Sequence, residues 1–176
     1  MIYENTVEQI IWDGIADDFE GLRNAGLDLD ITATYFRQLN LASYGVADIV
    51  SISFNKGVDV EKKSFLEYEI YVYELKKDAI KCSAVSQVMK YRQGLIKYLE
   101  KIGSESGFDR CFGNCFTVLI GKSLHEELNY IDFQEPFFYT YKYMLNGLVF
   151  KEYNFIDRKE HEDFSRLDHT TITKFI

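Results

Sequence analysis

Three residues near the middle of the sequence have the types and spacing of a site for phosphate chemistry. Glu74 and Lys76 end a run of alternating apolar residues, and Asp48 lies at the start of an earlier β-rich run, just after a glycine. Residues i and i+2 of a strand share a face, so Glu74 and Lys76 lie on the core-facing side of their strand. Charges in such a row are costly to bury unless they pair or bind a metal. The pattern therefore indicates a paired or metal-binding site.

The two β-rich runs, residues 47–54 and 65–75, predict an antiparallel hairpin that brings Asp48 beside Glu74. Two carboxylates and the Leu75 carbonyl then supply hard oxygen ligands for Mg²⁺ or Mn²⁺. A metal held there polarises a phosphoryl oxygen and activates a water, while Lys76 holds that water or offsets developing charge. Phosphodiester hydrolysis is the chemistry that this set predicts.

The surrounding periodicities predict the elements that position these residues. An apolar stripe of helical spacing runs from Val7 to Leu22, after a capping-box pattern at Asn5 and Thr6. We expect strands at 35–41, 47–54, 65–75, 115–121, 137–144 and 148–155, a loop at 55–63, a helix at 83–103, a short helix near 124–128 and a turn at 146–147. This order, α-β-β-β-α-β with a mixed end, predicts an α/β fold (an α+β mixed sheet) in one domain, 1–176, with a charged C-terminal tail at 156–176.

Four short motifs stand in a fixed order along the chain: an acid in the first helix, G-V-A-D at 45–48, E-L-K at 74–76 and Q-V-M-K-Y at 87–91. In this order and context the sequence resembles the PD-(D/E)xK, or restriction-endonuclease-like, nuclease superfamily, and within it the RecB-like branch. The resemblance runs from residue 8 to residue 91. Ala47 stands where the family name has proline, a departure that many RecB-like members share.

The resemblance implies a restriction-endonuclease-like core with a central mixed sheet flanked by helices, and a role for each matched residue. Asp48 and Glu74 would bind the metal with the Leu75 carbonyl, Lys76 would assist the water, and Glu8 would reach the metal from its helix. Glu4 is the alternative helix acid. Gln87 and Tyr91 lie one helical turn apart and would support the site or touch phosphate.

Basic residues predict where a nucleic acid would lie. Residues 76–101 hold seven Lys and Arg against two acids, and the set includes Lys77, Lys81 and Lys90. They either contact phosphates or form a solvated helix face. Arg37 and Gln38 precede GVAD; one of them should face Asp48, and Arg37 either contacts substrate phosphate or is an edge-strand charge.

Net charge and composition narrow the protein class. The chain carries -8, and residues 1–30 hold eight acids against one base, which argues against nonspecific coating of nucleic acid. The sequence shows no membrane span and no export signal, so we expect a cytoplasmic protein without a membrane partner. Three cysteines without an export signal argue for ordinary thiols rather than a disulfide framework.

The leading hypothesis is a Mg²⁺-dependent deoxyribonuclease, with endonucleolytic action, in DNA repair, restriction or mobile-element defence. We expect DNA rather than RNA as the partner, although an RNA-cleaving enzyme would use the same site, and a homodimer or larger complex would supply specificity. The alternative is a catalytically inactive nuclease-fold protein that acts as an interaction or inhibitor module. Each motif also has an ordinary interpretation: an exposed pair at Glu74 and Lys76, a turn residue at Asp48, and a half-buried pair at Gln87 and Tyr91.

Overall fold

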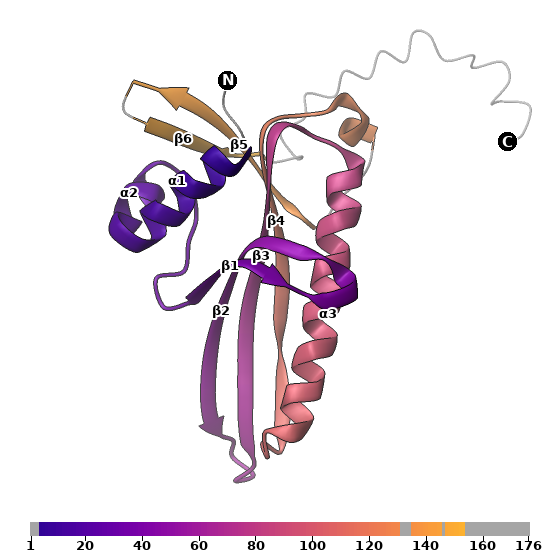
Figure 1. Cartoon of the computed structure of the whole chain (residues 1–176). Helices are drawn as coiled ribbons and strands as arrows, with labels where there is room; N and C mark the ends of the chain where they lie inside the picture. Colours follow the sequence, from indigo (N-terminus) through magenta and orange to yellow (C-terminus); the bar gives the residue numbers. More distant parts are fainter. Residues whose placement is uncertain (1–3, 131–134, 146, 154–176) are drawn as a thin grey trace, which may run out of the picture.

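Six strands form one mixed sheet in the computed structural model, which describes residues 4–130, 135–145 and 147–153 (Figure 1). The strands lie in the order of the sequence: β1 (Thr34–Asn40), β2 (Val46–Val58), β3 (Ser64–Ile80), β4 (Arg110–Leu124), β5 (Phe137–Met144) and β6 (Gly147–Glu152). The helices are α1 (Glu4–Asp17), α2 (Phe19–Asn24), α3 (Cys82–Glu105) and two short 3-10 helices, η1 (Ala42–Tyr44) and η2 (Glu126–Tyr130).

The connections explain the mixture of strand directions. β1, β2 and β3 form an antiparallel meander, as the short loops between them require. β3 and β4 are parallel, with α3 as the crossover that a parallel pair needs. β5 is parallel to β4, and β6 is antiparallel to β5. The expected α/β class with a mixed sheet is confirmed.

One face of the sheet is covered by α3 along the length of β3 and β4 (Figure 1). Its apolar residues recur every three or four positions, from Ala84 through Val88 to Leu99, and pack on β3 residues such as Ile70 and Val72. Full burial of such a side chain contributes about 1.5–3 kcal/mol relative to exposure. This packing holds the first half of α3 over the end of β3, where Glu74 and Lys76 lie.

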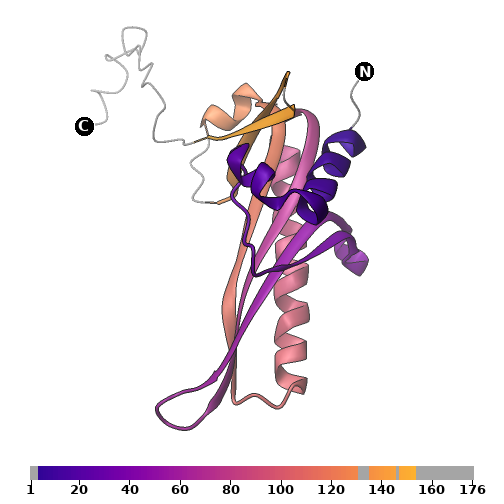
Figure 2. The same ribbon diagram turned by 90° about the vertical axis from the view of Figure 1, so that its left-hand side faces the viewer.

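The opposite face is covered at one end only. There α1 contributes Val7 and Ile11 to a second core with Tyr73 and Leu75 of β3, and the β5–β6 hairpin adds Phe150. Figure 2 shows α1 and α2 gathered at this end, while the β2–β3 turn lies at the other end of the sheet. β3 is thus enclosed on both faces at the end where the site residues lie.

Several expected boundaries are wrong. The first stripe forms two helices, because Asp18 leaves the helical conformation and its side chain accepts from the Gly21 N–H. Since α1 already includes residue 5, the expected capping box does not start it. The 55–63 loop is shorter, because β2 reaches Val58, and the strand expected at 115–121 extends over all of β4. Lys77 lies in β3 rather than in the basic helix.

Three further expectations extend outside the described residues. The 156–176 tail lies wholly outside them, the 146–147 turn does so at residue 146, and the strand expected at 148–155 does so at residues 154 and 155. Cys82, Cys111 and Cys115 are free thiols, and burial raises the pKa of Cys115 to about 12.

In the described part of the chain, no helix has the length and apolar character needed to cross a membrane.

Candidate active site

Asp48 marks the point where β2 separates from β3. The ladder between these strands begins at the pair Ile49 and Tyr73, and Asp48 precedes it. The Leu75 N–H donates to Oδ2 of Asp48 at 2.8 Å instead of to a strand carbonyl. In an antiparallel ladder the N–H and C=O of one residue face the same neighbouring strand, so the Leu75 carbonyl also faces this gap. The carboxylate and the carbonyl therefore open onto the same space between the strands.

A second contact fixes Asp48 from the other side. Nε2 of Gln38 donates to Oδ1 of Asp48 at 3.1 Å, which agrees with the expectation that Arg37 or Gln38 would face it. Gln38 has a φ of 50°, in the left-handed region that non-glycine residues rarely adopt. Residues four apart in a regular strand share a face, but Tyr35 packs in the core under α1 and Leu39 packs against the core under α3. The alternation of β1 therefore changes between them. The sequence carries no signal for this irregularity at a glutamine.

Glu74 and Lys76 lie on the α3 face of β3, as the alternation predicts. Glu74 is 2% exposed, and its Oε1 accepts from the Lys76 Nζ at 2.6 Å. The same Nζ donates to Oε1 of Gln87 at 3.5 Å. Nε2 of Gln87 in turn donates to the Tyr91 hydroxyl at 2.5 Å. A chain of hydrogen bonds thus links the E-L-K and Q-V-M-K-Y motifs across the helix–sheet interface.

Tyr91 connects this chain to the G-V-A-D motif. Burial raises its pKa, and the nearby charges of Glu74 and Asp48 raise it further. Gly45, with a φ of 115°, leaves so little room that an added Cβ would lie 2.8 Å from the Tyr91 ring. Only glycine fits both this backbone conformation and this contact. The first residue of the motif therefore serves to let Tyr91 approach the aspartate.

Glu8 reaches the same region from α1. It is 7% exposed, and its Oε1 accepts from the Arg37 Nε at 2.6 Å. Nη1 of Arg37 also donates to Oε1 of Gln9 at 2.8 Å. Arg37 therefore pairs with the helix acid, which neither of its two expected roles included. The Glu4 side chain lies outside the described part of the structure.

The Glu8 carboxylate is close enough to affect Asp48. Burial raises the pKa of Asp48 above its ordinary value of 3.8, and the charge of Glu8 raises it further. The hydrogen bonds from Leu75 and Gln38 and the charge of Lys76 oppose this rise. An aspartate that is partly buried beside another carboxylate is a place where a cation is electrostatically favoured.

Mg²⁺ is bound by hard oxygen ligands in near-octahedral geometry. Within the described residues, no group of three or more His, Cys, Asp or Glu is arranged to hold a metal ion. The donors themselves are hard oxygens: the carboxylates of Asp48, Glu74 and Glu8 and the carbonyl of Leu75. Lys76 and Arg37 neutralise Glu74 and Glu8 in this arrangement. The residues fit a hydrated divalent cation by their chemistry.

The lysines expected to contact phosphate lie on β3, on α3 or next to it. Lys77 and Lys90 are exposed, on β3 and α3, and Lys81 is the residue immediately before α3. Arg92, from the same basic segment, instead donates its Nε to the Cys115 carbonyl at 2.6 Å and lies 3.5 Å from Glu135. Arg92 therefore anchors α3 to β4.

Comparison with protein-family models, with curated proteins and with solved structures finds no match to this chain.

Proposed function

We propose that this protein is a metal-dependent nuclease of the restriction-endonuclease-like superfamily that hydrolyses phosphodiester bonds in DNA. One observation supports the proposal: hydrogen bonds and electrostatic effects link residues 8, 48, 74, 76, 87 and 91, which come from α1, β2, β3 and α3. Hydrogen bonds link Lys76 to Glu74 and Gln87, and electrostatic effects link Asp48 to Glu8 and Tyr91. If each motif were only an ordinary exposed or half-buried pair, we would expect the motifs at separate places in the fold.

Asp48, Glu74, Glu8 and the Leu75 carbonyl would hold Mg²⁺ or Mn²⁺ in this site. When bound, the metal supplies a Lewis acid for the phosphate and a water of lowered pKa. Lys76 donates hydrogen bonds to the attacking water and offsets negative charge that develops on the phosphoryl oxygens. Gln87 accepts from the Lys76 ammonium and so fixes its position, and Tyr91 holds Gln87.

DNA would approach along α3, where Lys81, Lys90 and the neighbouring Lys77 offer cations to phosphates. Such contacts position a nucleic acid without reading its sequence. Sequence specificity then requires additional surface, which we propose a second copy or a larger complex supplies.

The test measures metal binding and cleavage together. Calorimetric titration with Mg²⁺ and Mn²⁺ is paired with cleavage of single- and double-stranded DNA and RNA. We expect the wild type to bind metal and cut DNA, and Glu74→Gln to lose both. Glu69→Gln is the matched control, because Glu69 lies exposed on the same strand and faces away from α3. A wild type that binds no metal and cuts none of these substrates contradicts the proposal.

Lys76→Ala separates catalysis from metal binding. The metal ligands remain, so the metal should still bind, while cleavage should fall by roughly 10²- to 10³-fold, as for the loss of one group that stabilises transition-state charge. Lys151→Ala, at an exposed lysine of β6, should change neither. Equal loss of metal binding and cleavage in Lys76→Ala would assign the lysine to the structure of the site.

The second candidate is an inactive nuclease-fold protein that binds another protein. The net charge of -8 favours it, and so does the neutralisation of Glu8 and Glu74 by Arg37 and Lys76. In this case the wild type binds no divalent cation and cuts no nucleic acid, and Asp48→Ala gives the same result as the wild type in both assays.

A further inference from the structure

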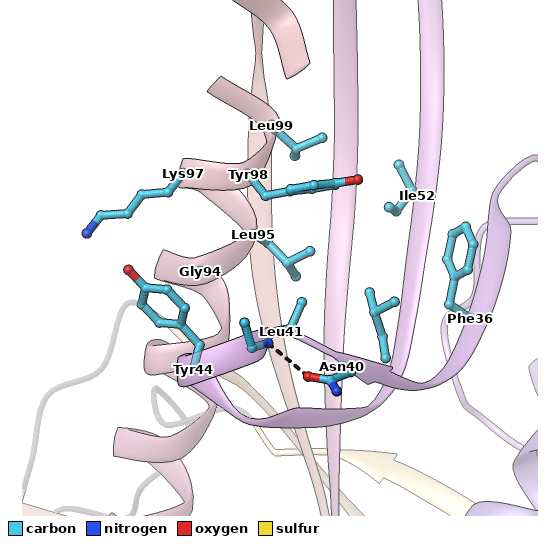
Figure 3. Close-up of a pocket in the computed structure, with 12 residues that line it drawn as sticks. Phe36, Asn40, Leu41, Tyr44, Ile52, Gly94, Leu95, Lys97, Tyr98 and Leu99 are labelled. Carbon is cyan, nitrogen blue, oxygen red and sulfur yellow. Dashed lines mark hydrogen bonds between the residues drawn. The ribbon is translucent and has the colours of Figure 1, made fainter. Parts of the chain in front are cut away.

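A cavity of about 580 Å³ lies between α3, β1, β2 and η1 (Figure 3). Aromatic rings of Phe36, Tyr44 and Tyr98 stand around it, with aliphatic side chains between them. Tyr98 is 59% exposed and Phe36 is 38% exposed. Large apolar side chains left exposed around a cavity of this size are typical of a binding site for a small molecule or for one unit of a polymer.

The cavity shares three elements with the candidate active site. On β1, Phe36 and Asn40 line the cavity, and Gln38 between them binds Asp48. On η1, Tyr44 lines the cavity, and the next residue is Gly45, which abuts Tyr91. On α3, Tyr98 lies seven residues after Tyr91, which is about 10 Å along the helix. A ligand that contacts Tyr98 would therefore lie about 10 Å along α3 from Tyr91.

The charge of the cavity differs from that of the chain. Among the described residues that line it, Lys97 is the single charged one, although the chain carries -8. The Lys97 Nζ lies 5.7 Å from the centre of the Tyr44 ring, at the edge of the cavity (Figure 3). A flat apolar group with an attached anion matches aromatic walls with a cation at the edge.

The Asn40 amide adds a directional group. Its Oδ1 accepts from the Ala42 N–H at 2.9 Å, which turns the amide within the cavity wall (Figure 3). The NH₂ group of the same amide can then donate to a carbonyl of a ligand. Thymine, cytosine and guanine carry such carbonyls on a flat ring, and the sugar attached to the ring carries the phosphate.

We propose that this cavity binds an unpaired base of the DNA strand that is cut, and that the substrate is therefore single-stranded DNA or DNA with a single-stranded segment. The inference rests on the proposed nuclease function. The base stacks against Tyr98 or Phe36, and Lys97 binds an adjacent phosphate. A base inside a duplex is stacked and paired, so it reaches the cavity only after it is extruded. Single-stranded DNA avoids that cost.

The test measures binding in EDTA, so that cleavage does not interfere. Fluorescein-labelled dT12, its duplex with dA12, and an abasic strand of equal length are titrated by fluorescence anisotropy. We expect the wild type to prefer dT12. Tyr98→Ala should weaken dT12 binding by about 5- to 100-fold, the range for loss of one base stack, and leave the abasic strand unchanged. Tyr98→Phe retains the ring and should retain binding.

Tyr143→Ala is the matched control, because Tyr143 is an exposed aromatic residue of β5, outside the cavity. Circular dichroism checks that each variant folds. Equal affinity of the wild type for dT12 and the abasic strand, or absence of DNA binding, overturns the inference. It is also overturned if Tyr98→Ala abolishes a dimer seen by sedimentation and leaves dT12 binding intact, because a second copy then occupies the cavity.

Failure of this inference is distinguishable from failure of the proposed function. Metal-dependent cleavage with no effect of Tyr98→Ala overturns the base-binding cavity and leaves the nuclease in place. Binding of dT12 that depends on Tyr98, without cleavage in Mg²⁺ or Mn²⁺, supports the cavity and removes the hydrolytic function.

Discussion

The Asp48 carboxylate takes the place of a backbone acceptor for the Leu75 N–H, and it does so in a partly buried position near Glu8. Its raised pKa shows that the charged form is less favoured here than in water. A cation bound beside Asp48 would favour its charged form.

The first prediction concerns Asp48→Asn without metal. The unfolded chain releases the Asp48 proton near pH 3.8, but the folded chain releases it only at the raised pKa. The stability that protonated Asp48 contributes is therefore lost as the pH rises from the unfolded-state pKa through the folded-state pKa. The variant should match the wild type in Tm below pH 3.8 and exceed it above the window. Each 1 kcal/mol corresponds to about 2–4 °C for a chain of this size.

Differential scanning fluorimetry across pH measures this effect, and Mg²⁺ should raise the Tm of the wild type alone. Asp109→Asn is a useful control, because hydrogen bonds from Ser64 lower the pKa of Asp109. Its stabilising effect is present above its ordinary pKa and lost on acidification, so that variant should be less stable at neutral pH. A lower Tm of Asp48→Asn at neutral pH would contradict the prediction.

A second prediction concerns Arg37→Ala. Removal of the arginine leaves Glu8 charged and buried near Asp48. The loss of stability should approach, but stay below, the roughly 3–5 kcal/mol of a fully buried pair, because Arg37 is partly exposed. Divalent metal should then raise Tm more in the variant than in the wild type. Arg23→Ala, which breaks an exposed pair with Glu20, should change neither quantity. An equal metal response in all three proteins would place Glu8 outside the metal site.

At the scale of elements, residue periodicity predicted most of the structure. The strand expected at 137–144 has these bounds, and α3 extends the expected helix by one residue at the start and two at the end. The face of Glu74 and Lys76 also followed from the two-residue period of a strand. The break at Asp18 and the left-handed Gln38 did not, because each depends on side-chain hydrogen bonds that periodicity does not represent.

The candidate site was predicted from the order of the four motifs, and its function stays a prediction. Hydrogen bonds do link residues of two of these motifs, from Glu74 through Lys76 and Gln87 to Tyr91, because each lies on a regular element. The Arg37–Glu8 pair was missed, since it joins residues 29 apart in sequence on two elements whose packing no local pattern determines. The contact between Gly45 and Tyr91 was missed for the same reason.

The third prediction tests that contact. Gly45→Ala places a Cβ 2.8 Å from the Tyr91 ring at a φ of 115°. We expect a loss of about 1–3 kcal/mol from backbone strain, and cleavage reduced by about 10²-fold as the site residues move. Gly107→Ala is the matched control, because Gly107 also has a positive φ, of 75°, but nothing lies within 4 Å of its added Cβ. Urea denaturation and cleavage assays separate the two effects. Equal loss of activity in both variants would exclude a specific role for the contact.

At the scale of the whole molecule, the charge is unevenly placed. The acidic N-terminal segment and the basic residues near α3 belong to opposite faces of the same sheet. A polyanion would therefore be repelled from the α1 face and attracted to the α3 face. Net charge alone does not describe how such a surface would interact with a polyanion.

The fourth prediction uses this placement. Lys81→Glu with Lys90→Glu should weaken DNA binding and reduce the slope of log K against log salt by about 1.4–1.8, because two phosphate contacts release fewer counterions. Lys62→Glu with Lys63→Glu makes the same change of net charge at the β2–β3 turn, at the other end of the sheet (Figure 1). Its slope should stay close to that of the wild type. Equal slopes in the two double variants would show that Lys81 and Lys90 act only through the net charge of the protein.

The bond from the Leu75 N–H to Asp48 makes one backbone proton sensitive to the state of the site. An amide that donates to a carboxylate resonates at a different frequency from one whose acceptor is protonated or bound to a cation. In an ¹⁵N-labelled sample, the Leu75 cross-peak would therefore follow the ionisation of Asp48 during a pH titration. The same cross-peak would follow cation binding during a titration with diamagnetic Mg²⁺. The chemical shift of the Leu75 amide is therefore an NMR reporter of this site, and it can be followed without substrate and without catalysis.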